Sequence, residues 1–598
     1  MNDLKPTDVI NKVTSVGVSP SSSNTFLSKL AYRLPSFKHV KIISFLLALV
    51  MALPLITLLF EAFSSSGDSF AHIRETVLTD YVINTVLLMG SVGTLVLIIG
   101  IPLAWLIANC DFWGKRFFNW ALVLPLAMPA YLVAYTYTDL LDYAGPIQVA
   151  LRDWFGWTSV NDYWFFDIRS LSGAAVMLSL VLYPYVYLMV RASFLEQNAT
   201  LTQAARVLGK SPFKCFMQVS LPLARNAIVA SCALVMMESM ADFATVNYFA
   251  VSTLTTAVYD TWLGHYDLAS AAKLSSIMVM GVFVLLFLEQ LQKGKQKSSN
   301  DAKVSQQSLT YKLSKKQTVF AVSFCSVILF VAFIVPVFVL LQYAVNYFEQ
   351  SWSTQVFEFA LNSAGIAFIT ALLALLLSLI LNYAYRVKPN KVQAFSLKAA
   401  SSGYAIPGTV MAIGVLVPLT FLDIQMNDLA IWLGFSAPGL LLSGSVIAII
   451  FAHLVRFIAI ANKTLESSYE KISPSLDMVA KTMGTNGGSL LKKVHIPLVR
   501  KSAMVAALLI FVESMKELPA ALLLQPFDFQ TLPTYVYQYA SDEQLELAAL
   551  GAILIVLVGL IPLLILNRSI DSSSIDSSSI DSTNIDSSKV IQNRVNGK

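Results

Sequence analysis

The sequence predicts an all-α polytopic membrane protein with about twelve transmembrane helices, arranged as two parallel six-helix repeats. Three observations predict this class: the composition, the spacing of the apolar segments and an internal repeat. The 598 residues are 56% hydrophobic and only 13% charged, whereas soluble proteins are about 45–50% apolar and about 25% charged. So few charges cannot cover a water-facing surface. The composition therefore excludes a cytosolic enzyme, a disordered protein and a nucleic-acid-binding protein.

Twelve segments have the roughly 20 apolar residues that a membrane-crossing helix needs. They are 42–62, 83–108, 118–140, 171–190, 226–248, 274–291, 318–342, 362–385, 399–422, 439–460, 502–525 and 546–567. We assign 42–292 to a first repeat and 318–567 to a second. The rest is an N-terminal tail (1–41), a basic linker (293–317) and a Ser/Asp-rich C-terminal tail (568–598), whose repeated IDSSS units predict disorder.

The positive charges predict the orientation of these spans. With the N-terminus placed inside, 35 of the 41 Lys and Arg residues fall on the inner side and four on the outer side. Cytoplasmic loops carry the excess of Lys and Arg in membrane proteins. Both termini are therefore expected in the cytoplasm, and the polar N-terminal tail is too long to be the start of a cleaved signal peptide.

The two halves match each other at fixed offsets. Asn84 and Pro129 correspond to Asn362 and Pro407 at an offset of 278. At an offset of 275, without a gap, Leu201, Ala205, Leu208, Gly209, Pro222, Arg225 and Glu238 correspond to Leu476, Ala480, Met483, Gly484, Pro497, Arg500 and Glu513. Six spans per half and equivalent loops on one side predict parallel repeats.

The repeated loops, 195–225 and 464–500, each predict a short helix with one apolar face. Asn198 and Ser473 stand at the N-cap positions, and Pro474 follows at the first helical position. Gly209 and Gly484 are placed to end these helices in a left-handed conformation. An apolar stripe on an exposed cytoplasmic loop can pack on the chain's own spans or on a partner.

This pattern resembles the EAA loop of ABC importer permeases, E-A-A-x(3)-G-x(9)-I-x-L-P. Gln203 replaces the glutamate in the first loop, and Met478-Val479 replaces Glu-Ala in the second. The resemblance implies a type I importer permease in a bacterial inner (plasma) membrane, with two ABC ATPase subunits bound to its loops on the cytoplasmic side. It assigns ATPase coupling to Leu201, Gln203, Ala204, Ala205, Leu208, Gly209, Pro222, Leu476, Ala480, Met483, Gly484 and Pro497.

The chain itself has no sequence for binding ATP, since GxxxxGK[ST] does not occur. We expect a transport subunit without catalytic residues and without a cofactor of its own, so ATP and Mg would be used by the partner subunits. The four cysteines and five histidines show no paired spacing, so no metal site is assigned. No outer segment exceeds about thirty residues, so the solute-binding domain is also expected on another polypeptide.

Four acidic residues within predicted spans are candidates for the substrate pathway. They form two pairs spaced i, i+4, namely Glu238 with Asp242 and Glu513 with Glu517. Carboxylates inside a membrane are costly and mark ion pathways, and oxygen-rich acidic sites suit hard cations. Two structural alternatives stay open: Lys516 could neutralise one pair, or the acids could cap broken helices, as Pro519 suggests.

Several further runs make the chain similar to fused permeases of ferric-iron ABC importers. They are 129–139, 142–146, 238–243, 402–409 and 513–519, and the similarity covers all twelve spans. It implies ferric iron as the solute and a periplasmic ferric-binding protein as a partner, besides membrane lipid. An ABC permease for thiamine or a polyamine, and a twelve-span secondary transporter of the major-facilitator type, remain as alternatives.

Overall fold

The computed structural model describes residues 37–63, 68–197, 199–293, 310–387, 389–485 and 487–562. Within these ranges, ten helices are long and apolar enough to cross a membrane, and up to twelve if each of two bent helix pairs is one span. This agrees with the predicted all-α class and with about twelve spans. Nearly all of the two predicted tails, together with the N-cap candidate Asn198, lies outside the described residues.

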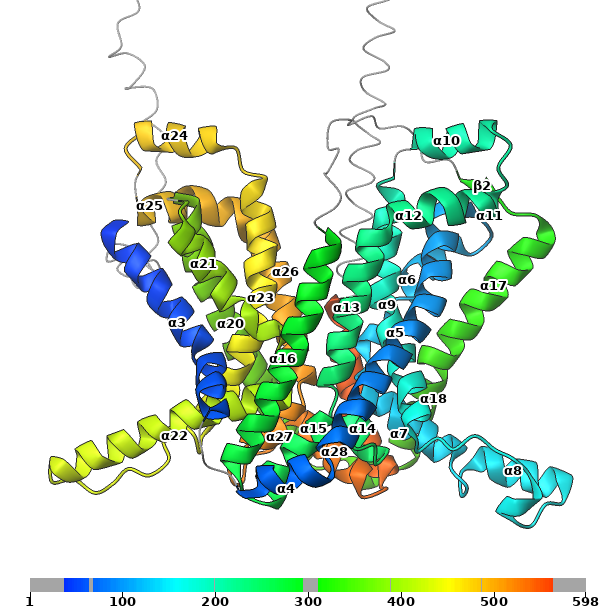
Figure 1. Cartoon of the computed structure of the whole chain (residues 1–598), viewed down its shortest axis with the longest axis horizontal. Helices are drawn as coiled ribbons and strands as arrows, with labels where there is room; N and C mark the ends of the chain where they lie inside the picture. The colour runs from blue at the N-terminus through cyan, green and yellow to red at the C-terminus, as the bar shows by residue number, and fades with distance from the viewer. Residues whose placement is uncertain are drawn as a thin grey trace, which may run out of the picture.

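The first repeat is helical almost throughout (Figure 1). Its elements are α3 (Phe37–Ala62), α4 (Asp68–Thr76), α5 (Leu78–Asn109), β1 (Cys110–Asp111), α6 (Lys115–Ala121), η1 (Leu124–Ala127), α7 (Ala130–Leu141), α8 (Pro146–Phe155), η2 (Val160–Asp162), α9 (Leu171–Leu195), α10 (Ala199–Val207), α11 (Pro212–Cys215), η3 (Phe216–Ser220), α12 (Leu221–Leu223), α13 (Arg225–Ala241), α14 (Ala244–Tyr248), α15 (Leu254–Tyr259), η4 (Asp260–Gly264) and α16 (Leu268–Lys293).

The second repeat has equivalent elements in the same order. They are β2 (Tyr311–Lys312), α17 (Lys315–Leu329), η5 (Phe330–Ile334), α18 (Val335–Asn346), α19 (Phe348–Ser351), α20 (Thr354–Val387), α21 (Lys391–Ala400), η6 (Ser402–Ala405), α22 (Gly408–Trp432), α23 (Val446–Glu470), α24 (Pro474–Thr482), α25 (Gly488–Leu490), η7 (Leu491–His495), α26 (Ile496–Lys516), α27 (Pro519–Leu524) and α28 (Leu532–Ser541). A last helix spans Leu545–Pro562.

Several spans that the sequence predicts as single helices are broken in the structure. Predicted span 118–140 divides at Pro129, where the two helical parts meet at 89°. The predicted span 399–422 is divided in the same way at Pro407, so its long helix begins only at Gly408. Proline lacks the N–H that a helix interior needs, which explains both breaks.

The internal repeat extends to individual hydrogen bonds. The Asn84 amide donates to the Ser252 carbonyl (2.9 Å), and the Asn362 amide donates to the Gln530 carbonyl (3.1 Å). Asn362 and Gln530 lie 278 positions after Asn84 and Ser252, respectively. The same offset relates Ala250 and Asp528, which both have a positive φ. The repeated sequence therefore specifies a repeated backbone.

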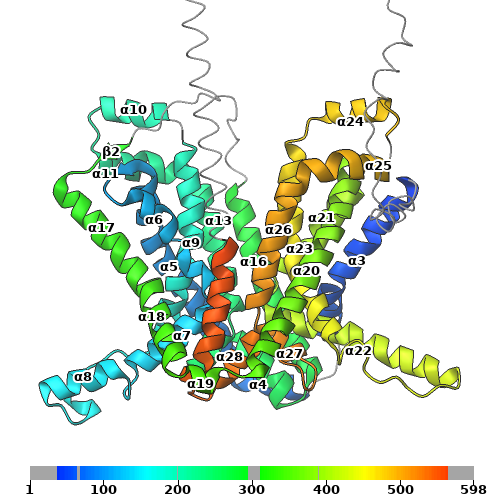
Figure 2. The ribbon, with the colours of Figure 1, turned by 180° about the vertical axis from the view of Figure 1, so that it is seen from behind.

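The halves exchange one span each, which the sequence did not predict. Figures 1 and 2 show α3 beside α21 and α22 of the second repeat, and α17 with α18 beside α7 and α9 of the first. The Thr57 hydroxyl donates to the Gly414 carbonyl (3.0 Å), and the Tyr137 hydroxyl donates to the Val331 carbonyl (2.6 Å). The sequence repeats 42–292 and 318–567 are thus not the packing units.

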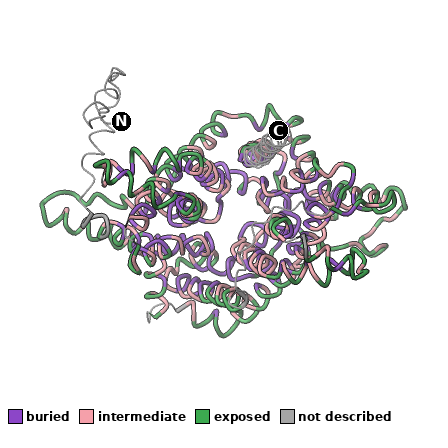
Figure 3. The backbone as a smooth tube through the Cα atoms, turned by 90° about the horizontal axis from the view of Figure 1, so that it is seen from above, coloured by how far each residue is buried: buried purple, intermediate pink, exposed green. Residues whose placement is uncertain are grey.

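The halves diverge toward α10 and α24 and meet at the opposite end, near α27 and α28 (Figures 1 and 2). At this closed end, Arg169 forms ion pairs with Asp142 (3.0 Å) and Glu543 (2.7 Å). Viewed from above, buried residues lie inside the bundles and exposed residues line the periphery (Figure 3).

The predicted linker 293–317 is partly structured. Helix α16 ends at Lys293, α17 begins at Lys315, and Tyr311–Lys312 pairs in parallel with Cys110–Asp111. The short strand therefore ties the start of the second repeat to the end of α5.

Candidate functional site

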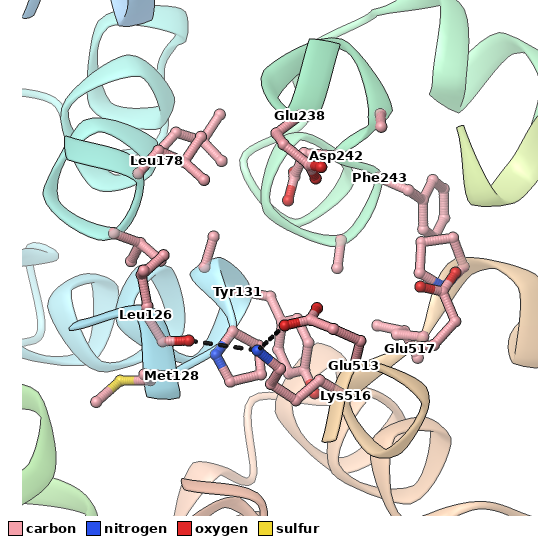
Figure 4. A pocket seen from close by; sticks show the side chains of 18 of the residues that line it. Leu126, Met128, Tyr131, Leu178, Glu238, Asp242, Phe243, Glu513, Lys516 and Glu517 are labelled. Atoms are coloured by element: carbon pink, nitrogen blue, oxygen red, sulfur yellow. Dashed lines mark hydrogen bonds and ion pairs between the residues drawn. The ribbon is translucent and has the colours of Figure 1, made fainter. Parts of the chain in front are cut away.

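The four acidic residues selected from the sequence line one cavity (Figure 4). The cavity has a volume of about 160 Å³, which holds several water molecules or a hydrated ion. Its walls come from both repeats: from η1, α7, α9 and α13 on one side, and from α23, α26 and α27 on the other. The spans thus bring together, across the repeat interface, residues about 275 positions apart.

On the first-repeat wall, Glu238 lies in the last turn of α13, and Asp242 follows the end of that helix. The Asp242 carboxylate accepts hydrogen bonds from the backbone N–H of Thr245 (3.0 Å) and Val246 (3.3 Å) and from the Thr245 hydroxyl (3.1 Å). Asp242 thus caps α14, as the second structural alternative expected. Among the described residues, no Lys or Arg forms an ion pair with Glu238 or Asp242.

On the second-repeat wall, both carboxylates are paired with basic side chains. Lys516 Nζ lies 3.1 Å from Glu513 Oε1 and 3.3 Å from the Leu126 carbonyl oxygen, to which it donates across the interface (Figure 4). Arg456 Nη1 lies 2.7 Å from Glu517 Oε1, with 12% and 7% of these side chains exposed. Glu517 also stands just after the end of α26, at the break before Pro519.

Arg456 is a cavity residue that the sequence analysis did not select. It lies on α23 and lines the cavity together with the acids. The residue that faces it is Gly408, at the start of α22. A Cβ at Gly408 would lie 2.7 Å from Arg456 Nη1 and would collide with Glu517 Oε1. The glycine therefore leaves the space that the buried ion pair occupies.

The charges of the cavity are distributed asymmetrically. The positions equivalent to Arg456 and Lys516 in the first repeat, at an offset of 275, are Val181 and Ala241. Both basic residues therefore come from the second repeat, where they balance Glu513 and Glu517. Glu238 and Asp242 leave the first-repeat wall with a formal charge of −2.

The carboxylates do not form a preassembled metal centre in this conformation. Within the described part of the chain, no three His, Cys, Asp or Glu side chains are grouped closely enough to hold a metal ion. The cavity can attract a cation through its net charge and offer it carboxylate oxygens from the first repeat.

The predicted coupling helices are α10 and α24, at the open end of the molecule (Figures 1 and 2). Gly209 and Gly484 have φ of +78° and +80°, which confirms the left-handed helix ends. The N–H of the following residue, Lys210 or Thr485, donates to the carbonyl of Ala205 or Ala480 at 3.1 or 3.0 Å. Ser473 caps α24, and Pro474 is its first residue, as predicted.

The apolar stripe on each helix is only partly covered. Ala205 and Ala480 are buried, whereas the side chains at both ends of the stripe are exposed. Leu201 is 50% exposed, Leu208 77%, Leu476 46% and Met483 78%. Packing within the chain therefore buries only the alanine of each stripe. The larger apolar side chains remain accessible to a partner. Gln203 and Ala204 lie on the same helix, α10.

The prolines of the repeated loops follow distorted turns. Pro222 comes after the π-helical turn η3, and Pro497 comes after the equivalent turn η7, 275 residues later. Proline has no backbone N–H, so the carbonyl four residues before it receives no helical hydrogen bond. A π turn, with its wider spacing, accommodates this break. These turns connect each coupling loop to the span that carries the acids.

The two coupling helices are held by different contacts. On α24, Asp477 forms an ion pair with Arg386 (2.8 Å), and its other oxygen lies 3.1 Å from His495 Nε2. On α10, the Arg206 guanidinium lies 4.7 Å from the centre of the Tyr311 ring, next to the β1–β2 pair. Each contact connects a coupling helix to the bundle beneath it.

Comparison with known proteins agrees with this arrangement. Residues 100–297 match the family described as the inner membrane component of binding-protein-dependent transport systems. This region includes the first coupling loop, and the equivalent loop is repeated at an offset of 275. Residues 100–297 are thus similar to the permeases of ABC transporters. Together with the ten to twelve candidate spans, this similarity supports a multi-pass inner-membrane transport subunit rather than an enzyme.

Similar curated proteins include permeases that match most of this chain and a permease that matches about a third of it. The Fe(3+)-transport system permease protein FbpB 2 of Haemophilus influenzae is 26% identical over 81% of this chain and 89% of its own length. The ferric transport system permease protein FbpB of Actinobacillus pleuropneumoniae is 22% identical over 79% of this chain and 69% of its own length. The molybdenum transport system permease protein ModB of Escherichia coli is 28% identical, but its match covers 36% of this chain and 94% of its own length. ModB thus matches about a third of this chain over nearly its own whole length, which agrees with two permease units in one chain.

Proposed function

We propose that this permease carries ferric iron from the periplasm to the cytoplasm in an ATP-driven importer. The observation that carries the proposal is the cavity between the repeats, where four carboxylates face two basic groups. The resulting net negative charge favours a cation and repels an oxyanion. The similarity to ferric permeases over most of the chain supports iron as the cation, whereas the charge argues against the cargo of the molybdenum permeases.

The partners follow from the same proposal. Two ATPase subunits bind α10 and α24, whose exposed apolar side chains at the open end fit a protein cleft. This end is cytoplasmic, because the basic loops lie there. A ferric-binding protein delivers its iron at the opposite end, where the two repeats meet.

The mechanism is alternating access. ATP binding by the two ATPases draws α10 and α24 together, and the rigid loops transmit this movement to α13 and α26. The halves then close at the cytoplasmic end and open toward the binding protein. The structure has its halves apart at the α10 and α24 end, which corresponds to the inward-facing state (Figures 1 and 2).

The asymmetric charges give the basic residues a role in this cycle. Arg456 and Lys516 neutralise Glu517 and Glu513 while no cargo is present, so a cation entering the cavity meets Glu238 and Asp242 first. A cavity with all four carboxylates unopposed would bind a trivalent ion too strongly to release it. The basic groups therefore favour release toward the cytoplasm.

The test is iron uptake by a neutralised double variant, Glu238→Gln/Glu513→Gln, in membrane vesicles supplied with ⁵⁵Fe-loaded binding protein and ATP. We expect normal expression and retained ATPase activity, with uptake lost. Lys516→Met serves as a control for a purely structural role, because breaking the same ion pair should then be as harmful. Full uptake by the double variant, or equal loss of expression in both proteins, would contradict the pathway.

A further inference from the structure

Two apolar arms extend from the bundle at the end opposite α10 and α24. The first arm comprises residues 146–166, that is α8 and the segment that returns from it. The second arm comprises residues 421–441, the distal part of α22 and its return. Figures 1 and 2 show both arms at the level of α4 and α28, pointing away from each other and from the centre of the molecule.

The tips of the arms are equivalent positions of the internal repeat. The sequence Trp154-Phe155-Gly156-Trp157 corresponds to Trp432-Leu433-Gly434-Phe435 at an offset of 278. Gly156 and Gly434 both have a positive φ, of +70° and +84°. In both arms the residue after this glycine donates its N–H five residues back, at 3.0 Å in the first arm and 2.9 Å in the second.

The side chains at these tips are large, apolar and uncovered. Trp154 is 84% exposed and Trp432 is 81% exposed. Trp164 and Phe435, on the returning segments, are 87% and 70% exposed. Apolar patches of this extent on a water-facing surface are rare and mark an interaction site. The arms therefore have a partner that the isolated chain does not supply.

Each arm is a folded unit and not a loose loop. In the first arm, the Tyr163 hydroxyl donates to Gln148 Oε1 (2.5 Å), and its ring stacks on Trp157 with the centroids 4.8 Å apart. In the second arm, the buried Asp423 carboxylate accepts from the N–H groups of Leu442 (2.9 Å) and Ser443 (2.8 Å). The first contacts join α8 to its returning segment, and the second set closes the base of the second arm.

We propose that the two arms lie in the lipid–water interface of the leaflet at this end of the bundle and anchor that end in the membrane. Tryptophan and tyrosine concentrate at this interface because their rings have an apolar body and a polar edge. A bilayer surrounds the bundle on all sides, so it can cover two tips that point in opposite directions. A protein docked over the central end would face the centre of the molecule, from which both tips point away (Figures 1 and 2).

The functional consequence is a separate membrane anchor for each half at the end that opens toward the binding protein. The arms extend the footprint of the closed end in the plane of the membrane, while the α10 and α24 end carries no equivalent arms among the described residues. Each half can then tilt about its own arm, so that closing the α10 and α24 end opens the opposite end.

The test is the depth of nitroxide spin labels in the full-length protein, reconstituted into phosphatidylcholine vesicles. Labels replace Trp154, Trp432 or Phe527 as single cysteines; Phe527 is a matched control because it is 96% exposed at the same end but not on an arm. We expect the labels at 154 and 432 to collide more with oxygen, which concentrates in lipid, than with a water-soluble nickel chelate. The label at 527 should show the opposite preference.

Nickel accessibility at 154 and 432 as high as at 527 would overturn the proposal, and so would burial of these labels only when binding protein is added. A second measurement avoids dependence on the cysteine variants. Intrinsic tryptophan fluorescence should be quenched by lipids brominated near the headgroup, and Trp154→Phe/Trp432→Phe should lose part of that quenching. Unchanged quenching in this double variant also contradicts the proposal.

Discussion

Glu238 and Glu513 occupy equivalent positions of the repeat but have different surroundings. Glu513 is paired with Lys516, whereas Glu238 has no ion pair to a Lys or Arg within the described ranges. We therefore expect Glu238→Gln to reduce ⁵⁵Fe uptake by at least about tenfold, the factor that ~1.4 kcal/mol of lost attraction corresponds to. Glu513→Gln should reduce it less. Equal uptake by the two single variants would show that the asymmetry has no role in transport.

Gly408 provides a separate test of the Arg456–Glu517 pair. An alanine at this position places a methyl group where the ion pair lies, and overpacking a tight site costs about 1–3 kcal/mol. We expect Gly408→Ala to lower the thermal unfolding temperature and to impair uptake. Gly365 is the control, because a Cβ there meets nothing within 4 Å. The interpretation fails if the two alanine variants unfold at the same temperature.

At this scale the sequence predicted the acids and one of their partners, Lys516, but not the other, Arg456. The i, i+4 spacing and the common offset identified Glu238, Asp242, Glu513 and Glu517, and all four line the cavity. Arg456 has no basic equivalent in the first repeat, where Val181 stands at the same position. From the sequence alone it is a single positive charge within an apolar span. Its role depends on the packing of α23 against α22, which no local pattern contains.

The coupling loops lead to a prediction about two glycines. Gly209 and Gly484 have φ near +80°, a conformation that costs a β-branched residue about 1–3 kcal/mol. Nothing lies within 4 Å of a Cβ at either position, so a valine changes the backbone without a steric clash. Gly209→Val and Gly484→Val should each insert and accumulate normally but lose transport-coupled ATPase activity. Wild-type ATPase stimulation in both variants would contradict the coupling role.

The contacts that hold α10 differ from those that hold α24, so a substitution can weaken one loop and leave the other intact. Asp477→Asn removes the charge that pairs with Arg386 at 2.8 Å, and breaking a largely buried ion pair is costly. We expect reduced crosslinking between α24 and the ATPase, with crosslinking of α10 unchanged. Asp428, an exposed acid on the second arm, is a suitable control for loss of one negative charge. Equal loss at both helices would indicate general unfolding.

Local sequence signals defined these elements well, because capping residues and prolines act within a few positions. Ser473, Pro474 and the two glycines behave as predicted. The breaks at Pro129 and Pro407 were missed because apolar composition continues through them. A hydropathy window measures length and not direction, so it cannot separate a straight span from two short helices at 89°.

For the whole molecule, the testable property is orientation. Met483 on the α24 loop is 78% exposed, and Phe527 at the opposite end is 96% exposed. In intact cells, a membrane-impermeant thiol reagent should label Phe527→Cys from outside and should label Met483→Cys only after permeabilisation. The native cysteines 110, 215 and 325 are buried and Cys232 is half-buried, so labelling of the unmodified chain is subtracted as the background. Labelling of position 483 from outside would reverse the topology.

The exchange of α3 and α17 also affects how the chain is made. Thr57 bonds to Gly414, which follows it by 357 residues. At the usual 5–20 residues per second of synthesis, α3 waits roughly 20 to 70 s for its neighbour to leave the ribosome. During this time the face of α3 that later meets the second repeat is in contact with lipid or with the insertion machinery. The first span of each repeat packs on the other repeat, so fusion into a single polypeptide keeps each newly inserted first span and its complement in the same molecule.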